Sequence, residues 1–290
     1  MGCATPKAAI PTAPVMTAPL VNATVQLRHG RRSAADARMA LDSMTATLLR
    51  RSVARELEQS SSVISMTDLG MTYPNGKVAL SDVNVSIAPG DFVFLVGPSG
   101  AGKTTFIRLL IREHVPTTGS VIVAGRDLAR MRRRHIPALR RRFGIVFQDF
   151  RLLPNKSVYE NVAFALEVTG SSRAEIRRRV PQLLNLVGLH EHGQHLPTQL
   201  SGGEQQRTAI ARALVHDPAI LIADEPTGNL DPVTSWEIIQ LLIQINELGT
   251  TVLMATHNQE IVNAMRRRVL ALENGALIRD ELGAAYEREY

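Results

Sequence analysis

Residues 97–104 read GPSGAGKT, and this spacing of glycines before Lys-Thr is that of a phosphate-binding loop. Glycines let backbone N–H groups converge on phosphate oxygens, the Lys103 ammonium reaches the terminal phosphates, and the Thr104 hydroxyl is suited to Mg²⁺. A plain glycine turn between a strand and a helix is the alternative, which the GKT ending disfavours. The residues predicted to bind a nucleotide here are Gly97, Pro98, Ser99, Gly100, Ala101, Gly102, Lys103, Thr104 and Thr105.

Two adjacent carboxylates end an apolar run at residues 219–225, AILIADE. A buried strand has no packing reason to end on paired acids, although a strand that simply reaches solvent is the alternative. Asp224 is predicted to hold Mg²⁺ through its water shell, and Glu225 to polarise an attacking water. Together with Lys103, these groups predict phosphoryl transfer to water.

A second anion-binding element is predicted at residues 200–207, LSGGEQQR. Ser201 is a hydroxyl N-cap, and two glycines open the helix that follows, so its N-terminus favours a phosphate. Because the chain already has one complete phosphate loop, this second element predicts a head-to-tail dimer. Each nucleotide would lie between the loop at Lys103 and the partner's Ser201.

The elements that position these residues alternate between strands and helices, which predicts an α/β fold. Strands are expected over 91–96, 144–147, 219–224 and 251–256, and helices after Lys103, after Ser201 and over 232–248. Gln148 and His257 follow two of these strands. Taken alone, each would be a satisfied polar residue, but central strands of such sheets deliver ligand-binding side chains at their carboxyl ends.

The phosphate loop and LSGGEQQR together resemble the nucleotide-binding subunits of ABC transporters, from about Val63 to the C-terminus. The resemblance implies a P-loop NTPase domain of the ABC type over residues 63–290, with a RecA-like core, an antiparallel β subdomain and a helical subdomain at about 149–199. It implies an ATPase whose ligands are ATP and Mg²⁺.

The same resemblance implies roles for single residues. Tyr73 matches the aromatic residue on which adenine stacks, although a packing aromatic is the alternative. The implied catalytic residues are Glu225, His257 and Gln148, and the implied Mg²⁺ ligands are Thr104, Gln148 and Asp224. The implied contacts to ATP across the dimer are Ser201, Gly202, Gly203, Glu204 and Asp231.

Residues 147–166, 92–100 and 251–257 resemble the FtsE family of bacterial cell-division ATP-binding proteins. That resemblance implies a homodimer, peripheral on the cytoplasmic side of the cell membrane and bound there through the membrane protein FtsX. ATP-driven closure would then activate cell-wall hydrolases during division. The ADEPTGNLD segment at 223–231 is shared with exporter subunits, so a motor of a lipoprotein, peptide or small-molecule transporter stays open. A scaffold that uses ATP only to dimerise is disfavoured by the intact Glu225 and His257.

Composition excludes or disfavours several other classes of protein. The single cysteine, Cys3, excludes intrachain disulfides and cysteine zinc clusters and favours a reducing compartment. No apolar run approaches the roughly 18–20 residues of a membrane span, and no secretory segment follows Met1. No internal repeat appears, which disfavours tandem soluble cassettes.

Net charge is +6, and arginines cluster over residues 130–142 and 173–179. Nucleic-acid binding would call for interleaved aromatic residues, which these runs lack. We therefore expect a solvated face near anionic lipid headgroups and no nucleic-acid partner.

Residues 1–62 are rich in Pro, Ala, Thr and Ser, which predicts a disordered extension with one amphipathic helix between Leu41 and Leu57. This extension departs from the FtsE pattern. A regulatory or membrane-touching helix and a later translation start, near Val63 or Met66, stay open as alternatives. Acylation of Gly2 is disfavoured because Pro6 stands where a Ser or Thr is needed, and acylation of Cys3 is disfavoured because no lipobox precedes it.

Overall fold

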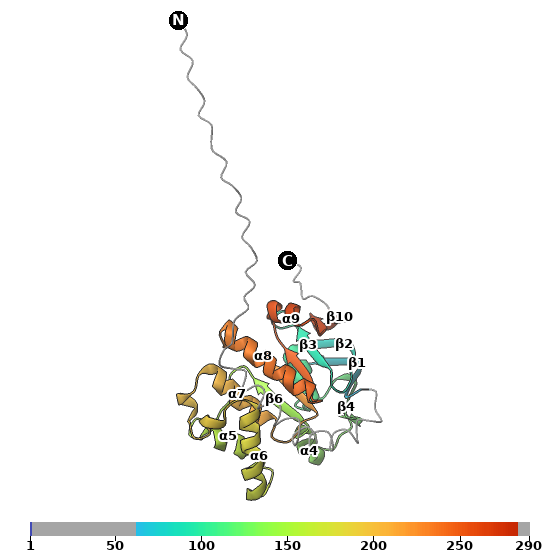
Figure 1. The fold of residues 1–290 in the computed structure, drawn as a ribbon. Coiled ribbons are helices and arrows are strands. Elements are labelled where there is room, and N and C mark those ends of the chain that lie inside the picture. The colour runs from blue at the N-terminus through green and yellow to red at the C-terminus, as the bar shows by residue number, and fades with distance from the viewer. Residues whose placement is uncertain (2–61, 284–290) are drawn as a thin grey trace.

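The computed structural model describes Met1 and residues 62–283, and Figure 1 shows the arrangement of their elements. The strands are β1 (Ile64–Thr72), β2 (Val78–Ile87), β3 (Phe92–Val96), β4 (Thr118–Val123), β5 (Arg126–Asp127), β6 (Phe143–Phe147), β7 (Ile220–Asp224), β8 (Thr251–Ala255), β9 (Arg268–Glu273) and β10 (Ala276–Leu282). The helices are α3 (Lys103–Leu110), α4 (Ile136–Arg140), α5 (Val158–Glu167), α6 (Arg173–Leu186), α7 (Gly202–Ala213), α8 (Pro232–Glu247) and α9 (Gln259–Met265), with 3-10 turns η2 (Arg133–His135), η3 (His190–His192) and η4 (Pro197–Gln199).

Two sheets form in the described residues. One is antiparallel, in the order β2-β1-β4-β5, and the other has the order β10-β9-β3-β8-β7-β6. In the larger sheet β3 pairs in parallel with β8 and β9, β7 pairs in parallel with β6 and β8, and β10 adds an antiparallel hairpin edge. The predicted α/β fold, with a separate antiparallel β subdomain, is confirmed.

Strand β3 is apolar along its whole length because both of its faces are covered. Phe94 and Val96 pack into the core made with α5 to α9, whereas Val93 and Leu95 pack into the core made with α3 and the antiparallel sheet. All five residues of β3 are buried. A central parallel strand with two covered faces reads as a continuous apolar run instead of an alternating one.

The parallel register brings three strand ends to one edge of the larger sheet. Phe147 pairs with Asp224, and Asp224 pairs with Ala255, so β6, β7 and β8 end at the same level. The phosphate loop follows the neighbouring strand β3. Residues just after these strands therefore meet at one crevice, as expected at the carboxyl edge of a parallel sheet.

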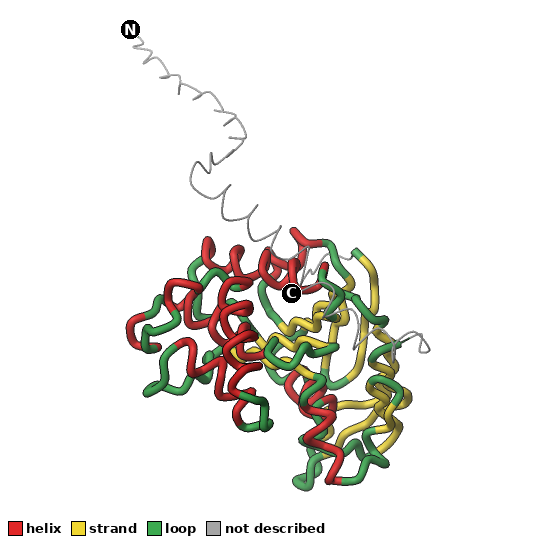
Figure 2. Tube along the Cα trace, turned by 60° about the horizontal axis from the view of Figure 1, so that its bottom comes forward, coloured by secondary structure: helices red, strands yellow, loops and turns green. Residues whose placement is uncertain are grey.

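Helices α5, α6 and α7 gather on the side of the molecule away from the antiparallel sheet, in both orientations shown (Figures 1 and 2). Ser157 starts α5 with a capping box closed by Glu160. Ser172 caps α6, and Pro181 lies inside that helix.

The prediction of a solvated arginine face is wrong for Arg179. Its relative exposure is 6%, and its guanidinium pairs with Asp217, while Arg173, Arg177 and Arg178 on the same helix are exposed. Burial lowers the pKa of Arg179. The four arginines span two faces of α6, and Arg179 falls on the face toward the core.

The predictions for Cys3 and for the extension up to residue 61 lie outside the described residues. Among the residues described, no helix combines the length and apolar character needed to cross a membrane.

Candidate active site

The phosphate loop joins β3 to α3 through two glycines in backbone conformations that other residues rarely adopt. Gly97 has φ 144°, and a Cβ there would lie 2.2 Å from the carbonyl oxygen of Leu272. Gly102 has φ 111° and caps α3 with no side-chain hydrogen bond, which leaves the first N–H groups of the helix for a ligand. The Lys103 Nζ donates to the carbonyl oxygens of Gly97 at 2.7 Å and Pro98 at 3.1 Å. These bonds hold the ammonium over the loop.

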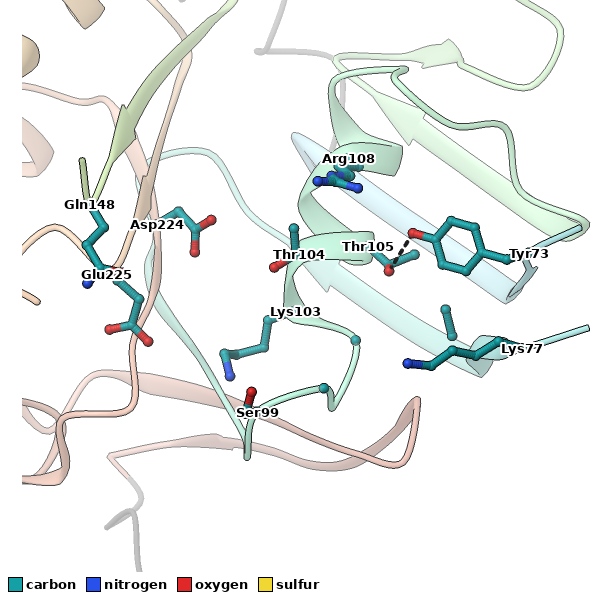
Figure 3. Close-up of a pocket in the computed structure, with 13 residues that line it drawn as sticks. Tyr73, Lys77, Ser99, Lys103, Thr104, Thr105, Arg108, Gln148, Asp224 and Glu225 are labelled. Carbon is teal, nitrogen blue, oxygen red and sulfur yellow. Dashed lines mark hydrogen bonds between the residues drawn. The ribbon is translucent and has the colours of Figure 1, made fainter. Parts of the chain in front are cut away.

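A cavity of about 450 Å³ opens beside this loop, and Figure 3 shows the side chains around it. Tyr73 and Lys77 lie on one side of α3, and Gln148, Asp224 and Glu225 lie on the other. Most of the residues predicted for ATP and Mg²⁺ therefore meet here. The lining residues are Tyr73, Lys77, Ala79, Ser99, Gly100, Gly102, Lys103, Thr104, Thr105, Arg108, Gln148, Asp224 and Glu225.

Lys77 and Arg108 are the charged residues of this cavity that sequence reasoning missed. Arg108 lies one helical turn after Thr104 on α3, so the 3.6-residue period was a usable signal. Lys77 lies in the β1–β2 turn, four residues after Tyr73, and its direction depends on that turn.

Tyr73 is fixed at the edge of the cavity by two contacts. Its hydroxyl lies 3.1 Å from the Thr105 Oγ1, and its ring meets His114 edge-on with centroids 5.5 Å apart. The adenine-stacking role of Tyr73 stays a prediction.

The two carboxylates differ in surroundings although they are neighbours in sequence. Burial, and then the negative charge of Glu225, raise the pKa of Asp224, whereas Lys103 opposes the shift. Glu225 follows β7 in a left-handed conformation with φ 49°, and its Oε1 lies 2.7 Å from the Nδ1 of His257. The His257 side chain is 61% exposed and that of Glu225 is 17% exposed, so this pair joins the cavity to the surface.

Gln148 is tied to the segment that follows the carboxylates. Its Nε2 donates to the Asn229 Oδ1 at 3.2 Å, and the Asn229 Nδ2 donates back to the Gln148 carbonyl oxygen at 3.0 Å. The turn after β6 and the turn after β7 are thereby interlocked.

The signature residues lie apart from the phosphate loop within one chain. Ser201, Gly203 and Glu204 line another cavity, of about 390 Å³, and Asp231 caps α8 by accepting from Val233 and Thr234. The anion-binding role of Ser201 across the dimer stays a prediction. The Glu204 Oε2 accepts from both the Ser201 N–H and its hydroxyl, so a carboxylate of the same chain occupies the start of α7.

The donor set suits Mg²⁺ better than a transition metal. Among the residues described, no three His, Cys, Asp or Glu side chains gather as a metal-binding group. Mg²⁺ is usually held by one or two carboxylates together with substrate phosphates, which matches Asp224 and the Thr104 hydroxyl beside the loop.

Comparison with known proteins decides the family. The ABC transporter domain matches residues 80–228. The cell division ATP-binding protein FtsE of Streptococcus pneumoniae is 56% identical over 78% of this chain and 98% of its own length, and that of Mycobacterium tuberculosis is 56% identical over 73% and 92%. The chain belongs to the FtsE family of ABC transporter ATP-binding subunits.

Solved structures agree with this assignment of the FtsE-family chain. A dimeric ATP-binding cassette, MJ0796, in a post-hydrolysis state bound to ADP and Pi, superposes with a TM-score of 0.68 at 36% identity over 77% of this chain and all of its own. CbiO1 of Clostridium perfringens, part of the ABC transporter complex cbiONQ, has a TM-score of 0.73 at 32% identity over 77% of this chain and 90% of its own. The chain is an ABC-type ATPase, as the sequence predicts.

Proposed function

We propose that this FtsE-family subunit binds Mg·ATP at the Lys103 loop, hydrolyses it in a head-to-tail homodimer, and transmits the change to a membrane partner of the FtsX type in cell division. The observation that carries the proposal is the convergence of Lys103, Asp224, Glu225 and Gln148 on one cavity. A purely structural nucleotide site would not need Glu225 and His257 in contact.

Hydrolysis assigns separate tasks to the residues of this cavity. The loop N–H groups and Lys103 bind the phosphates, and Thr104, Asp224 and Gln148 hold Mg²⁺, which would neutralise charge between the terminal phosphates. Glu225 accepts a proton from the attacking water while the water oxygen forms a bond to the γ-phosphorus. The bond to the β–γ bridging oxygen then breaks, which releases ADP and phosphate. His257 holds the Glu225 carboxylate toward this water.

The dimer is supported by the separation of the two half-sites within one chain. Ser201 and Gly203 line a different cavity from Lys103 and Thr104. A second copy that turns its α7 toward the loop would bring Ser201, Gly202, Gly203, Glu204 and Asp231 to the nucleotide. The similarity to a dimeric cassette bound to ADP and Pi favours this arrangement.

The contact with the membrane partner is proposed at the helical side, in the segment from Phe150 to Tyr159 and on α5. This segment directly follows Gln148, so a change at the γ-phosphate reaches it without an intermediate element. Two apolar side chains four residues apart are also left unburied at the end of α5: Phe164, at 38% exposure, and the C-cap residue Val168, at 67%. The naming of the relatives as cell division proteins favours FtsX over a transporter permease.

Co-purification with FtsX tests this assignment. The comparison sets the full chain beside a chain starting at Val63 and beside the double charge reversal Arg151→Glu and Lys156→Glu. We expect the reversal to weaken FtsX binding by about tenfold while the truncated chain still binds. Loss of binding on truncation, with the reversal still bound, would move the contact to the N-terminal extension. Capture of a transporter permease in place of FtsX would support the motor of a transporter.

A further inference from the structure

The turn that follows Gln148 has a strained backbone, and contacts from outside the turn are needed to stabilise it. Phe150 has φ 56° and Arg151 has φ 49°, two consecutive left-handed residues that are not glycine. Such conformations are strained in residues other than glycine and persist only when surrounding contacts impose them. The turn must therefore be fixed by groups outside its own backbone.

Arg212, in the last turn of α7, supplies this hold. Its Nη1 donates to the Arg151 carbonyl oxygen at 2.6 Å, and its Nη2 donates to the Phe150 carbonyl oxygen at 2.9 Å. The two amino groups of one rigid guanidinium thus bind the carbonyls of the two strained residues. A planar fork suits this pair of acceptors better than the single ammonium of lysine.

The charge of Arg212 has no acidic partner among the described residues. Arg179 on α6, which is more deeply buried, pairs with Asp217, whereas the hydrogen bonds of Arg212 go to backbone carbonyls. Burial lowers the pKa of Arg212. Because Arg212 is partly buried, its loss of hydration must be offset by hydrogen bonds, and these two carbonyls supply them.

Further contacts close the turn at its other points. The Arg151 guanidinium lies 3.7 Å from the Phe147 ring centroid, and its Nε lies 3.1 Å from the Asp149 Oδ1. A Cβ built on Gly202, the first residue of α7, would lie 4.0 Å from the Phe150 Cζ. The Phe150 ring therefore lies near the start of α7, and the turn is bound to the end of α7 through Arg212.

We propose that Arg212 is a positioning residue that clasps the turn at Phe150 and Arg151, keeps Gln148 directed at the nucleotide cavity, and joins α7 to that turn as one unit. This role rests on the ATPase activity of the family and not on the identity of the membrane partner. Arg212 does not line the cavity beside the phosphate loop and acts through the backbone of the turn.

The first test is Arg212→Lys in the full chain, with Arg179→Lys as the matched loss of a buried arginine elsewhere. We expect kcat to fall by about tenfold to a hundredfold, since a misplacement of about 1 Å can cost about 10² in rate, while the Kd for ATP changes less than about twofold. Amide exchange should accelerate by about tenfold or more in residues 147–153 only. Arg179→Lys should leave kcat and that exchange unchanged. An unchanged kcat, or an equal loss in both variants, would overturn the proposal.

A second test uses the unmodified chain and does not depend on a variant that folds. If Arg212 joins the two segments, residues 148–153 and residues 209–214 should open together. Their amide exchange rates should then rise with the same dependence on urea concentration. Opening of the turn at much lower urea, while the end of α7 stays protected, would show that Arg212 does not clasp it.

Discussion

Two helices of this ATPase begin beside glycines, yet their starts are built differently. Helix α3 begins after Gly102 with no side-chain cap, and Lys103 reaches back over the loop. Helix α7 begins after Ser201 with a closed capping box, in which Glu204 accepts from the Ser201 N–H and hydroxyl. The start of α3 has no side chain bound to it, whereas at the start of α7 the Ser201 N–H and hydroxyl are already bound by a carboxylate of the same chain.

This difference separates the residues expected to bind the nucleotide within one chain from those expected to act only in a dimer. An open helix start with a lysine can hold nucleotide phosphates within one chain. At α7 we expect a partner's nucleotide to compete with the Glu204 carboxylate for the Ser201 hydroxyl. We therefore expect the residues around the start of α3 to determine the affinity for ATP, and those around the start of α7 to determine the dependence on a second chain.

Loss of the lysine at the start of α3 should have the largest effect on ATP binding. Lys103→Ala removes the ammonium held over the loop, and we expect it to abolish measurable binding of Mg·ATP. Titration with a fluorescent ATP analogue checks this. Lys77→Ala, which removes a cation from the same cavity but not from the loop, should weaken binding only severalfold. Unchanged affinity in Lys103→Ala would remove the loop from the binding site.

Loss of the Glu225 carboxylate should spare binding and slow the chemistry. Glu225→Gln keeps the shape of the side chain but cannot accept a proton, so we expect turnover to fall by about 10² or more. A stable ATP-bound dimer should accumulate and be visible by light scattering. A monomeric variant with full activity would exclude Glu225 as the catalytic base.

The start of α7 can be tested against a matched cap, because α5 begins with the same capping box at Ser157. Ser201→Ala and Ser157→Ala should each lower the free energy of unfolding by about 1 kcal/mol, the usual cost of losing a hydroxyl N-cap. Only Ser201→Ala should also lower ATP turnover and ATP-dependent dimerisation. Equal turnover in the two variants would reduce Ser201 to a helix cap.

The smallest effect concerns the pH dependence of stability. The hydrogen bond from the Ser201 N–H lowers the pKa of Glu204 below its ordinary value of 4.5. A lowered pKa means that this stabilisation is present above pH 4.5 and is lost as pH falls through the folded-state pKa. Because the Glu204 side chain is still 31% exposed, solvent screens the interaction and the contribution should stay below about 1 kcal/mol. Glu204→Gln should therefore flatten the acid limb in urea titrations, and an unchanged acid limb would contradict the bond.

The fold and the site could be predicted wherever a functional residue and the element that positions it are close in sequence. The apolar run of β3, the glycines of the loop and the acids after β7 each follow from neighbours in the chain, so the α/β fold and most of the cavity could be predicted. Lys77, Arg179 and Arg212 could not, because their roles depend on which distant backbone or carboxylate they face. The Ser-x-x-Glu spacing of residues 201–204 is the sequence pattern of a capping box, so the hydrogen bonds between Ser201 and Glu204 could have been predicted. The two glycines directed attention to an anion site.

Mixing two inactive variants tests the head-to-tail site most directly. Lys103→Ala and Ser201→Ala homodimers each carry a defect at both sites. In a mixed dimer with composite sites, one site carries both defects and the other carries none. A one-to-one mixture should then recover about a quarter of the unmodified ATPase rate, since half of randomly paired dimers are mixed. A mixture that stays as inactive as its components would contradict the account, because each chain would then complete its own site.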